Sequence, residues 1–215
     1  MNISLVVFDL DGTLVSSHET IYKTTLHALK EVGINREIPE DKFCKKIGLH
    51  FEDIFHDFGF SVPNFEEFIT IYKSNYFTYL GSSFVYNGVN NIIKLLNSKN
   101  IFTALLTTKG QDQAELLLKH FGLRERFSYV MGRRPGIAHK PSPEPLLLIC
   151  KDLHVEPHKT IIVGDTEMDI ICGKKAGSKT CAVTYGYREK EFLEKQLPDF
   201  LIDNIEDLEY IVNGM

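Results

Sequence analysis

Two aspartates one position apart follow a short apolar run near the start of the chain. The run, Ile3–Phe8, is rich in branched residues, and Asp9-Leu10-Asp11-Gly12 comes directly after it. This pattern predicts a strand buried on both faces, with polar residues at its carboxyl end. Carboxylate oxygens suit Mg²⁺ as ligands, and an ionised aspartate can act as a nucleophile. The segment is therefore a candidate for metal binding and nucleophilic catalysis.

Reactive residue types also follow two later apolar runs. Phe102–Leu106 precedes Thr107-Thr108-Lys109-Gly110, and Thr160–Val163 precedes Gly164-Asp165-Thr166. Ligands bind at the carboxyl ends of the strands in open parallel sheets. If the strands are neighbours, we expect these groups to converge with Asp9.

The residue types together favour phosphoryl transfer. Asp9, Asp11 and Asp165 are predicted Mg²⁺ ligands, Asp11 through its backbone carbonyl. Asp9 is the predicted nucleophile, kept ionised by the metal and by Lys140 from the loop before a predicted helix. The Asp11 carboxylate would protonate the leaving alkoxide and later take a proton from the hydrolytic water. Lys140 and the Thr107 hydroxyl would neutralise the equatorial phosphate oxygens.

Three further residues near these groups have expected or open roles. Gly12 allows a tight turn, so that backbone amides can approach the phosphate. Asp169 either binds the metal directly or orients Asp165 and Lys140 without contacting the metal. We favour the second role. Lys109 is either a phosphate-site lysine or a solvated residue at the start of a helix.

The elements that must position these residues alternate along most of the chain. Strands that alternate with helices predict an α/β protein with a Rossmann-like three-layer core, its parallel sheet covered on both faces. The remaining strand candidates are Lys179–Val183, Ser128–Met131 and Phe200–Ile202. Helical patterns occupy Val89–Ser98, Gln111–Phe121, Pro143–Leu153, Met168–Ala176 and Ile205–Met215.

Residues 17–82 interrupt this alternation. They contain helical patterns such as Ile21–Val32 and Phe65–Tyr79 and no convincing strand. We therefore predict a small all-helical cap domain at 17–82, inserted after the first strand of a core made of residues 1–16 and 83–215. Because the insertion follows a polar strand end, we expect it to stand over the site as a lid.

The composition argues against nucleic acid and membranes as binding partners. A formal net charge of -5 over 215 residues offers no electrostatic footprint for nucleic acid or an anionic membrane surface. No stretch approaches the roughly 20 apolar residues of a membrane span, and the N-terminus lacks signal-peptide features. The four cysteines are dispersed, so we expect no disulfides. These features favour a cytoplasmic protein. From the motif chemistry above, the expected partner is a small phosphorylated metabolite, and both a monomer and a homodimer are expected forms.

The motifs resemble those of one known family. Phe8-Asp9-Leu10-Asp11-Gly12-Thr13-Leu14, Leu105–Lys109, Lys140–Pro145 and Val163–Asp169 look like the four signatures of the haloacid dehalogenase superfamily, in the right order and spacing. The Gly-Asp-Thr form of the fourth motif is similar to that of its phosphoglycolate phosphatase subgroup, as is Tyr185-Gly186-Tyr187.

The resemblance implies a Mg²⁺-dependent phosphatase that hydrolyses a small phosphate monoester, with phosphoglycolate as the first candidate. It implies phosphate contacts from Gly12, Thr107, Thr108 and Lys140. It also implies a hinged helical cap, in which Lys46, Gly48 and His50 lie where relatives place a substrate-specificity loop.

Three alternatives stay open. A sugar-phosphate mutase, similar to β-phosphoglucomutase, would use the same aspartate but exclude water. A pyrophosphatase would attack a phosphoanhydride instead of an ester. A protein that binds a partner through the cap and catalyses nothing would be expected to carry a broken motif, whereas every expected catalytic position is intact.

Overall fold

The computed structural model describes residues 3–214, and these form two compact units. The first unit contains the described residues up to Val15 and from Val85 onward, and the second contains Ser16–Phe84. The short strands β2 (Val15–Ser16) and β3 (Phe84–Val85), where the chain passes from one unit to the other, pair in a two-stranded sheet.

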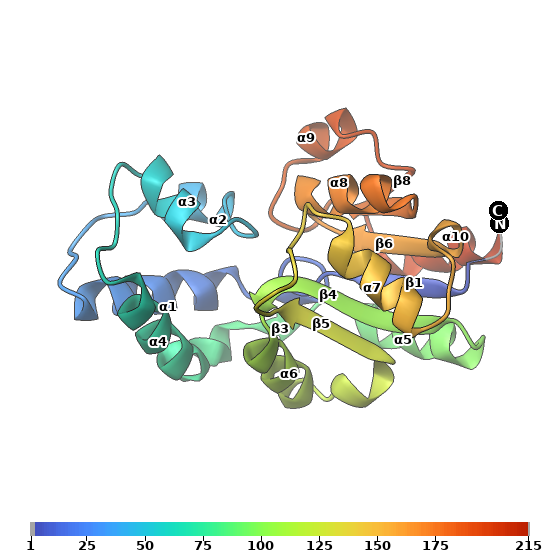
Figure 1. Cartoon of the computed structure of the whole chain (residues 1–215), viewed down its shortest axis with the longest axis horizontal. Helices are drawn as coiled ribbons and strands as arrows, with labels where there is room; N and C mark the ends of the chain where they lie inside the picture. The colour runs from blue at the N-terminus through green and yellow to red at the C-terminus, as the bar shows by residue number, and fades with distance from the viewer. Residues whose placement is uncertain (1–2, 215) are drawn as a thin grey trace. The chain divides into compact units, whose positions relative to one another are not determined.

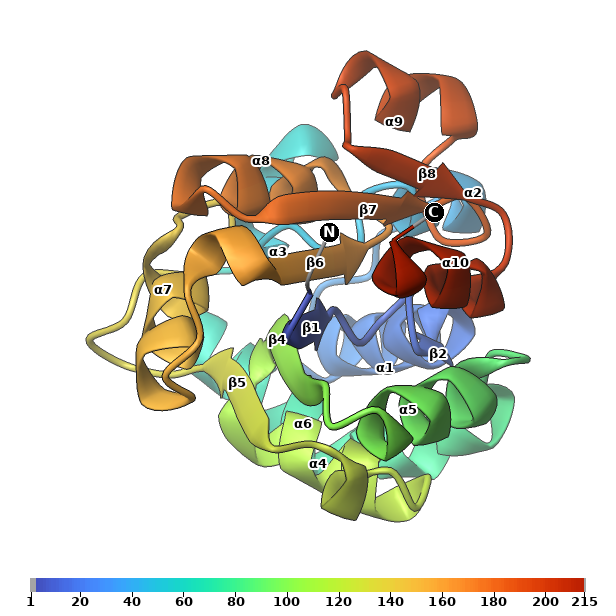
Figure 2. The same ribbon diagram turned by 90° about the vertical axis from the view of Figure 1, so that its right-hand side faces the viewer.

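A parallel six-stranded sheet forms the centre of the first unit (Figure 2). Its order is β5-β4-β1-β6-β7-β8, in which the chain reverses direction across the sheet at β1. The strands are β1 (Leu5–Phe8), β4 (Phe102–Gly110), β5 (Tyr129–Arg133), β6 (Thr160–Gly164), β7 (Lys179–Val183) and β8 (Phe200–Ile202). If only the strands of this sheet are numbered, in chain order, their spatial order is 3-2-1-4-5-6, as in dinucleotide-binding folds. In such folds the ligand binds in a crevice at the point where the strand order reverses.

The register of β1 aligns its carboxyl end with β4 and with the end of β6. Phe8 is aligned with Leu105 of β4 on one side and with Val163 of β6 on the other. The residues that follow, Asp9 and Asp165, therefore leave the sheet at the same edge. All four residues of β1 are fully buried, as expected for a strand covered on both faces.

Helices cover the two faces of the sheet. Figure 2 shows α7 (Glu144–Asp152) and α8 (Glu167–Ala176) on one side and α5 (Val89–Ser98) and α10 (Leu208–Asn213) on the other. The apolar core beneath α7 and α8 includes alternate residues of the strands, because successive side chains of a strand point to opposite faces. The other helices are α6 (Gln111–His120), α9 (Lys190–Lys195), η2 (Arg124–Arg126), η3 (Pro157–Lys159) and η4 (Ile205–Asp207).

The second unit is helical (Figure 1), and aromatic side chains pack in its core. It contains α1 (His18–Glu31), α2 (Glu40–Cys44), α3 (Phe51–Asp57), α4 (Phe65–Asn75) and the 3₁₀ segment η1 (Tyr76–Ser82). Phe51 packs edge-on against Phe68, with ring centroids 5.3 Å apart, and Tyr72 packs against Tyr76.

The predicted α/β fold class is confirmed, with local differences, and Met215 of the last predicted helix lies outside the described residues. The strand predicted to end at Leu106 continues to Gly110, with an irregularity in its pairing between these two residues. The helix predicted over Phe65–Tyr79 changes to 3₁₀ geometry after Asn75. All four cysteines are unpaired, as expected. Among the described residues, no helix has the length and apolar character needed to cross a membrane.

Candidate active site

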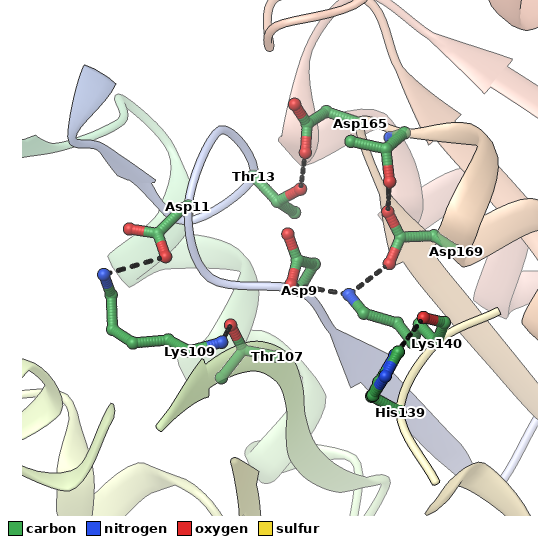
Figure 3. Close-up of polar contacts among 10 residues, drawn as sticks. Asp9, Asp11, Thr13, Thr107, Lys109, His139, Lys140, Asp165 and Asp169 are labelled. Carbon is green, nitrogen blue, oxygen red and sulfur yellow. Dashed lines mark hydrogen bonds and ion pairs between the residues drawn. The ribbon is translucent and has the colours of Figure 1, made fainter. Parts of the chain in front are cut away.

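A buried lysine joins two aspartates at the carboxyl end of the sheet. Lys140 Nζ, from the segment between β5 and α7, donates to Asp9 Oδ1 at 2.7 Å and to Asp169 Oδ1 at 2.5 Å (Figure 3). Each of the three side chains is less than one-tenth exposed. Charge-assisted bonds of this kind fix both carboxylates relative to the ammonium group.

Asp169 is held from its other side by the start of α8. Its Oδ2 accepts from Thr166 Oγ1 at 2.7 Å and from Thr166 N at 3.2 Å, which closes a capping box on the helix. A Cβ on Gly164 would lie 2.1 Å from Asp169 Cγ, so only glycine fits there. These contacts place Asp169 behind Lys140, where it fixes the position of the ammonium group.

Asp165 is enclosed by two segments that are distant in sequence. Its Oδ1 accepts from Thr13 Oγ1 at 3.1 Å, and its Oδ2 accepts from Tyr187 N at 2.8 Å. A Cβ on Gly12, whose φ is +88°, would lie 2.3 Å from Asp165 Oδ2, and one on Gly186 would lie 2.2 Å from Asp165 Cβ. Glycine at both positions lets the backbone close around a fully buried carboxylate.

Asp9, Asp165 and Asp169 could hold a metal ion. One ligand oxygen from each lies within 4.8 Å of those of the other two. With Lys140 the group has a formal net charge of −2 when all four side chains are ionised. A hard dication such as Mg²⁺ would balance that charge and prefers oxygen ligands. The donor set therefore fits the predicted metal: Asp9 and Asp165 would be the side-chain ligands, while Asp169 is already engaged by Lys140 and Thr166.

Burial shapes the ionisation of this group in the metal-free protein. Desolvation raises the pKa of Asp9 well above its usual value, helped by repulsion from Asp169 and Asp165 and opposed by Lys140. Desolvation and Asp169 also raise the pKa of Asp165 to about 7. Burial alone would lower the pKa of Lys140, but Asp169 and Asp9 outweigh it and raise the pKa. A bound cation would favour the ionised carboxylates.

Asp11 and Lys109 form a separate ion pair on the other side of Asp9 (Figure 3). Lys109 Nζ lies 3.3 Å from Asp11 Oδ2, and the two side chains are 6% and 12% exposed. Lys109 is part of the extended end of β4 and not of a helix, so the interpretation as a solvated helix start is wrong. The Thr107 hydroxyl accepts from Lys109 N at 3.1 Å in the same strand end.

The other predicted site residues lie in two places. Thr108 is half-buried on β4 between Thr107 and Lys109. Lys46, Gly48 and His50 belong to the second unit, in the stretch between α2 and α3, where Lys46 pairs with Asp57 at 2.5 Å.

Sequence reasoning missed the residues that enclose Asp165. Thr13 lies inside the first motif, but its bond to Asp165 depends on contact between β1 and β6. In the sequence, the Tyr185-Gly186-Tyr187 segment is distinguished only by its family resemblance. In the structure Tyr185 donates to Thr13 O at 2.9 Å, Gly186 packs on Asp165 and Tyr187 N binds it. The only sequence signal for this role was that a glycine stands between two tyrosines in this segment.

The fold and the site define a hydrolase of the haloacid dehalogenase-like class. A family model described as haloacid dehalogenase-like hydrolase matches residues 6–183, and the chain belongs to this family. The resemblance of the motifs is thereby confirmed.

Curated relatives match over the full length. Pyrophosphatase PpaX of Bacillus anthracis is 33% identical over 216 residues, covering 100% of this chain and 99% of that protein. The protein of the same name from Bacillus cereus has the same identity and coverage.

Solved structures share the fold. A structure described as a predicted phosphoglycolate phosphatase from Haemophilus somnus superposes with a TM-score of 0.84 and 26% identity, covering 98% of both chains. A haloacid dehalogenase-like family hydrolase from Streptococcus pneumoniae superposes with a TM-score of 0.85 and 25% identity, covering 97% of this chain and 98% of that one.

Proposed function

We propose that this chain is a Mg²⁺-dependent phosphatase that acts on a small phosphate compound through a phospho-aspartate intermediate on Asp9. The observation that carries this proposal is the convergence of Asp9, Asp165 and Asp169 around Lys140 at the point where the sheet reverses its strand order. The bound cation would shield the repulsion between an anionic nucleophile and an anionic phosphate.

The chain's own residues supply the steps. An Asp9 oxygen attacks phosphorus, so that a bond from phosphorus to Asp9 forms while the bond to the leaving oxygen breaks. Asp11, in its protonated form, gives a proton to the leaving oxygen. A water then attacks the phospho-aspartate, Asp11 takes its proton, and phosphate leaves with Asp9 restored. Lys140 and the Thr107 hydroxyl stabilise charge on the transferred oxygens.

Two substrates are supported by different observations. Pyrophosphate is favoured by the full-length relatives named pyrophosphatase PpaX, at 33% identity. Phosphoglycolate is supported by the motifs and by the structural relative at 26% identity. We place pyrophosphate first, because the identity is higher over the whole chain. The second unit is proposed to act as a cap, with Lys46, Gly48 and His50 contributing to substrate choice.

The test is phosphate release from pyrophosphate, phosphoglycolate and a sugar phosphate, with Mg²⁺ and after exhaustive chelation, with Asp9→Asn as the matched inactive control. We expect release by the wild type only, and only with Mg²⁺. Turnover by the Asp9→Asn variant would exclude Asp9 as nucleophile, and full activity after chelation would exclude the metal. Isomerisation of the sugar phosphate without phosphate release would identify a mutase instead.

A further inference from the structure

Two lysines flank Asp9, and their environments differ. Lys140 is shared between Asp9 and Asp169, so its charge serves the attacking carboxylate. Lys109 approaches from the opposite side, on the end of β4, and pairs with Asp11 at 3.3 Å (Figure 3). The proposed steps assign a role to Lys140 but none to Lys109.

The position of Lys109 relates it to the leaving group. In the proposed mechanism the Asp11 carboxylate must come within hydrogen-bond reach of the leaving oxygen, about 2.6–3.2 Å. Since Lys109 Nζ lies 3.3 Å from Asp11 Oδ2, its ammonium group lies beside the carboxylate that must reach the leaving oxygen. In the structure the Asp11 carboxylate is turned toward Lys109 and not toward Asp9 (Figure 3).

We propose that Lys109 binds a negatively charged group carried by the leaving part of the substrate, in place of the Asp11 carboxylate. The substrate class is then a phosphate compound whose leaving group is itself an anion, such as a second phosphate or a carboxylate. This inference rests on the proposed function and adds a specificity-determining residue to the same site.

The charges of Asp11 and Lys109 favour this exchange. Asp11 and Lys109 form a neutral pair with little exposure to water, so their attraction is weakly screened. A substrate anion that enters beside them would be repelled by Asp11 and attracted by Lys109. A neutral leaving group brings no charge to compete for the lysine, and the pair stays closed. The ion pair therefore discriminates between the two kinds of leaving group.

The experiment compares phosphoglycolate with ethyl phosphate, which has a leaving group of similar size without the carboxylate, and includes pyrophosphate. In Lys109→Met we expect the ratio of kcat/KM for phosphoglycolate over ethyl phosphate to fall by about 10- to 100-fold, the range of a lost charge-assisted hydrogen bond. The ratio for pyrophosphate over ethyl phosphate should fall similarly. Lys119→Met, on the exposed end of α6, is the matched control and should leave both ratios unchanged.

Equal losses with all three substrates, or no change in the ratios, would overturn the inference and show a structural role for Lys109. A second variant covers the case in which Lys109→Met does not fold. Asp11→Asn removes the competing anion, so the Kd of phosphoglycolate, measured without turnover, should fall by more than about 3-fold while that of ethyl phosphate stays constant. An unchanged Kd would contradict the exchange. If the wild type hydrolyses none of the three compounds, the proposed function itself has failed.

Discussion

Adding one methyl group at Gly186 should disable the site by moving Asp165. A Cβ at this position would lie 2.2 Å from Asp165 Cβ and 2.5 Å from Asp165 Oδ2, and Asp165 is fully buried. Carbon atoms make favourable contacts at about 3.5–4.0 Å, so one of the two segments must move by more than about 1 Å. The amide of Tyr187, the next residue, donates to the same carboxylate at 2.8 Å, so the displacement would also break this bond.

The size of the effect follows from the same geometry. Overpacking a close-packed interior costs about 1–3 kcal/mol of unfolding free energy, a fall in Tm of roughly 2–12 °C for a chain of this length. Misplacing a catalytic group by about 1 Å can cost ~10²-fold in rate, and disturbing the environment of a metal ligand typically costs ~10–100-fold in affinity. We therefore expect Gly186→Ala to lose about 10²-fold in kcat/KM and at least ~10-fold in Mg²⁺ affinity.

The assay is steady-state phosphate release with a Mg²⁺ titration, together with thermal unfolding. Gly81→Ala is the matched control, because a Cβ there meets no atom within 4 Å. Wild-type kcat/KM and Mg²⁺ affinity in a folded Gly186→Ala protein would refute the reasoning that the Tyr185–Tyr187 segment positions Asp165. A loss of stability alone, with the Mg²⁺ dependence unchanged, would refute it too.

Two further predictions concern the charges of the buried group. Lys140→Met leaves Asp9 and Asp169 without their ammonium partner, so the free energy of unfolding should fall by about 3–5 kcal/mol and kcat by at least ~10²-fold. Denaturant unfolding and phosphate release would measure both effects, with Lys119→Met as the control. Near wild-type values would contradict a shared ion pair. Because the pKa of Asp165 is raised to about 7 in the metal-free fold, against about 3.9 in the unfolded chain, the folded state binds the extra proton between these values. Stability without metal should therefore fall as pH rises from about 5 to 8, and the Tm gain on adding Mg²⁺ should be larger at pH 8 than at pH 5; a gain independent of pH, or the same gain in Asp165→Asn, would exclude this linkage.

Most of the sheet could be predicted, because each strand carries a local signal. Ile3–Phe8 and Thr160–Val163 are apolar runs that end in polar residues, and their parallel pairing follows from the alternation with helices. The convergence of Asp9 and Asp165 then needed only the assumption that the strands are neighbours. The two chain segments are far apart in sequence, but a parallel sheet brings their carboxyl ends together.

The extent of β4 could not be predicted for a physical reason. Thr107-Thr108-Lys109-Gly110 has no apolar alternation, so its sequence is typical of a loop before a helix. It stays in the sheet by pairing of Gly110 with Arg133 after an irregularity, a long-range contact with no local signal. Lys109 is thereby turned into a poorly exposed position, which its charge alone would not suggest.

The sequence pattern also does not predict the change from α-helix to 3₁₀-helix after Asn75. The aromatic residues at Phe68, Tyr72 and Tyr76 recur every four positions, which fits a continuing helix. In the structure Phe68 and Tyr72 pack against Phe51, and Tyr72 packs against Tyr76, the first residue of the 3₁₀ segment. Contacts of this kind depend on the fold of the whole unit and not on spacing alone.

The charges of the site constrain how phosphate can enter it. Asp9, Asp165, Asp169 and Lys140 carry a formal net charge of −2, and the Asp11–Lys109 pair adds none. At an effective dielectric of about 20, two unit charges 4 Å apart interact by about 4 kcal/mol, so a phosphate dianion would be strongly repelled from the metal-free group. Protonation of Asp9 would lower that repulsion but would also remove the nucleophile. A divalent cation bound to this group would offset the repulsion of phosphate and favour the ionised form of Asp9, as the proposed mechanism needs.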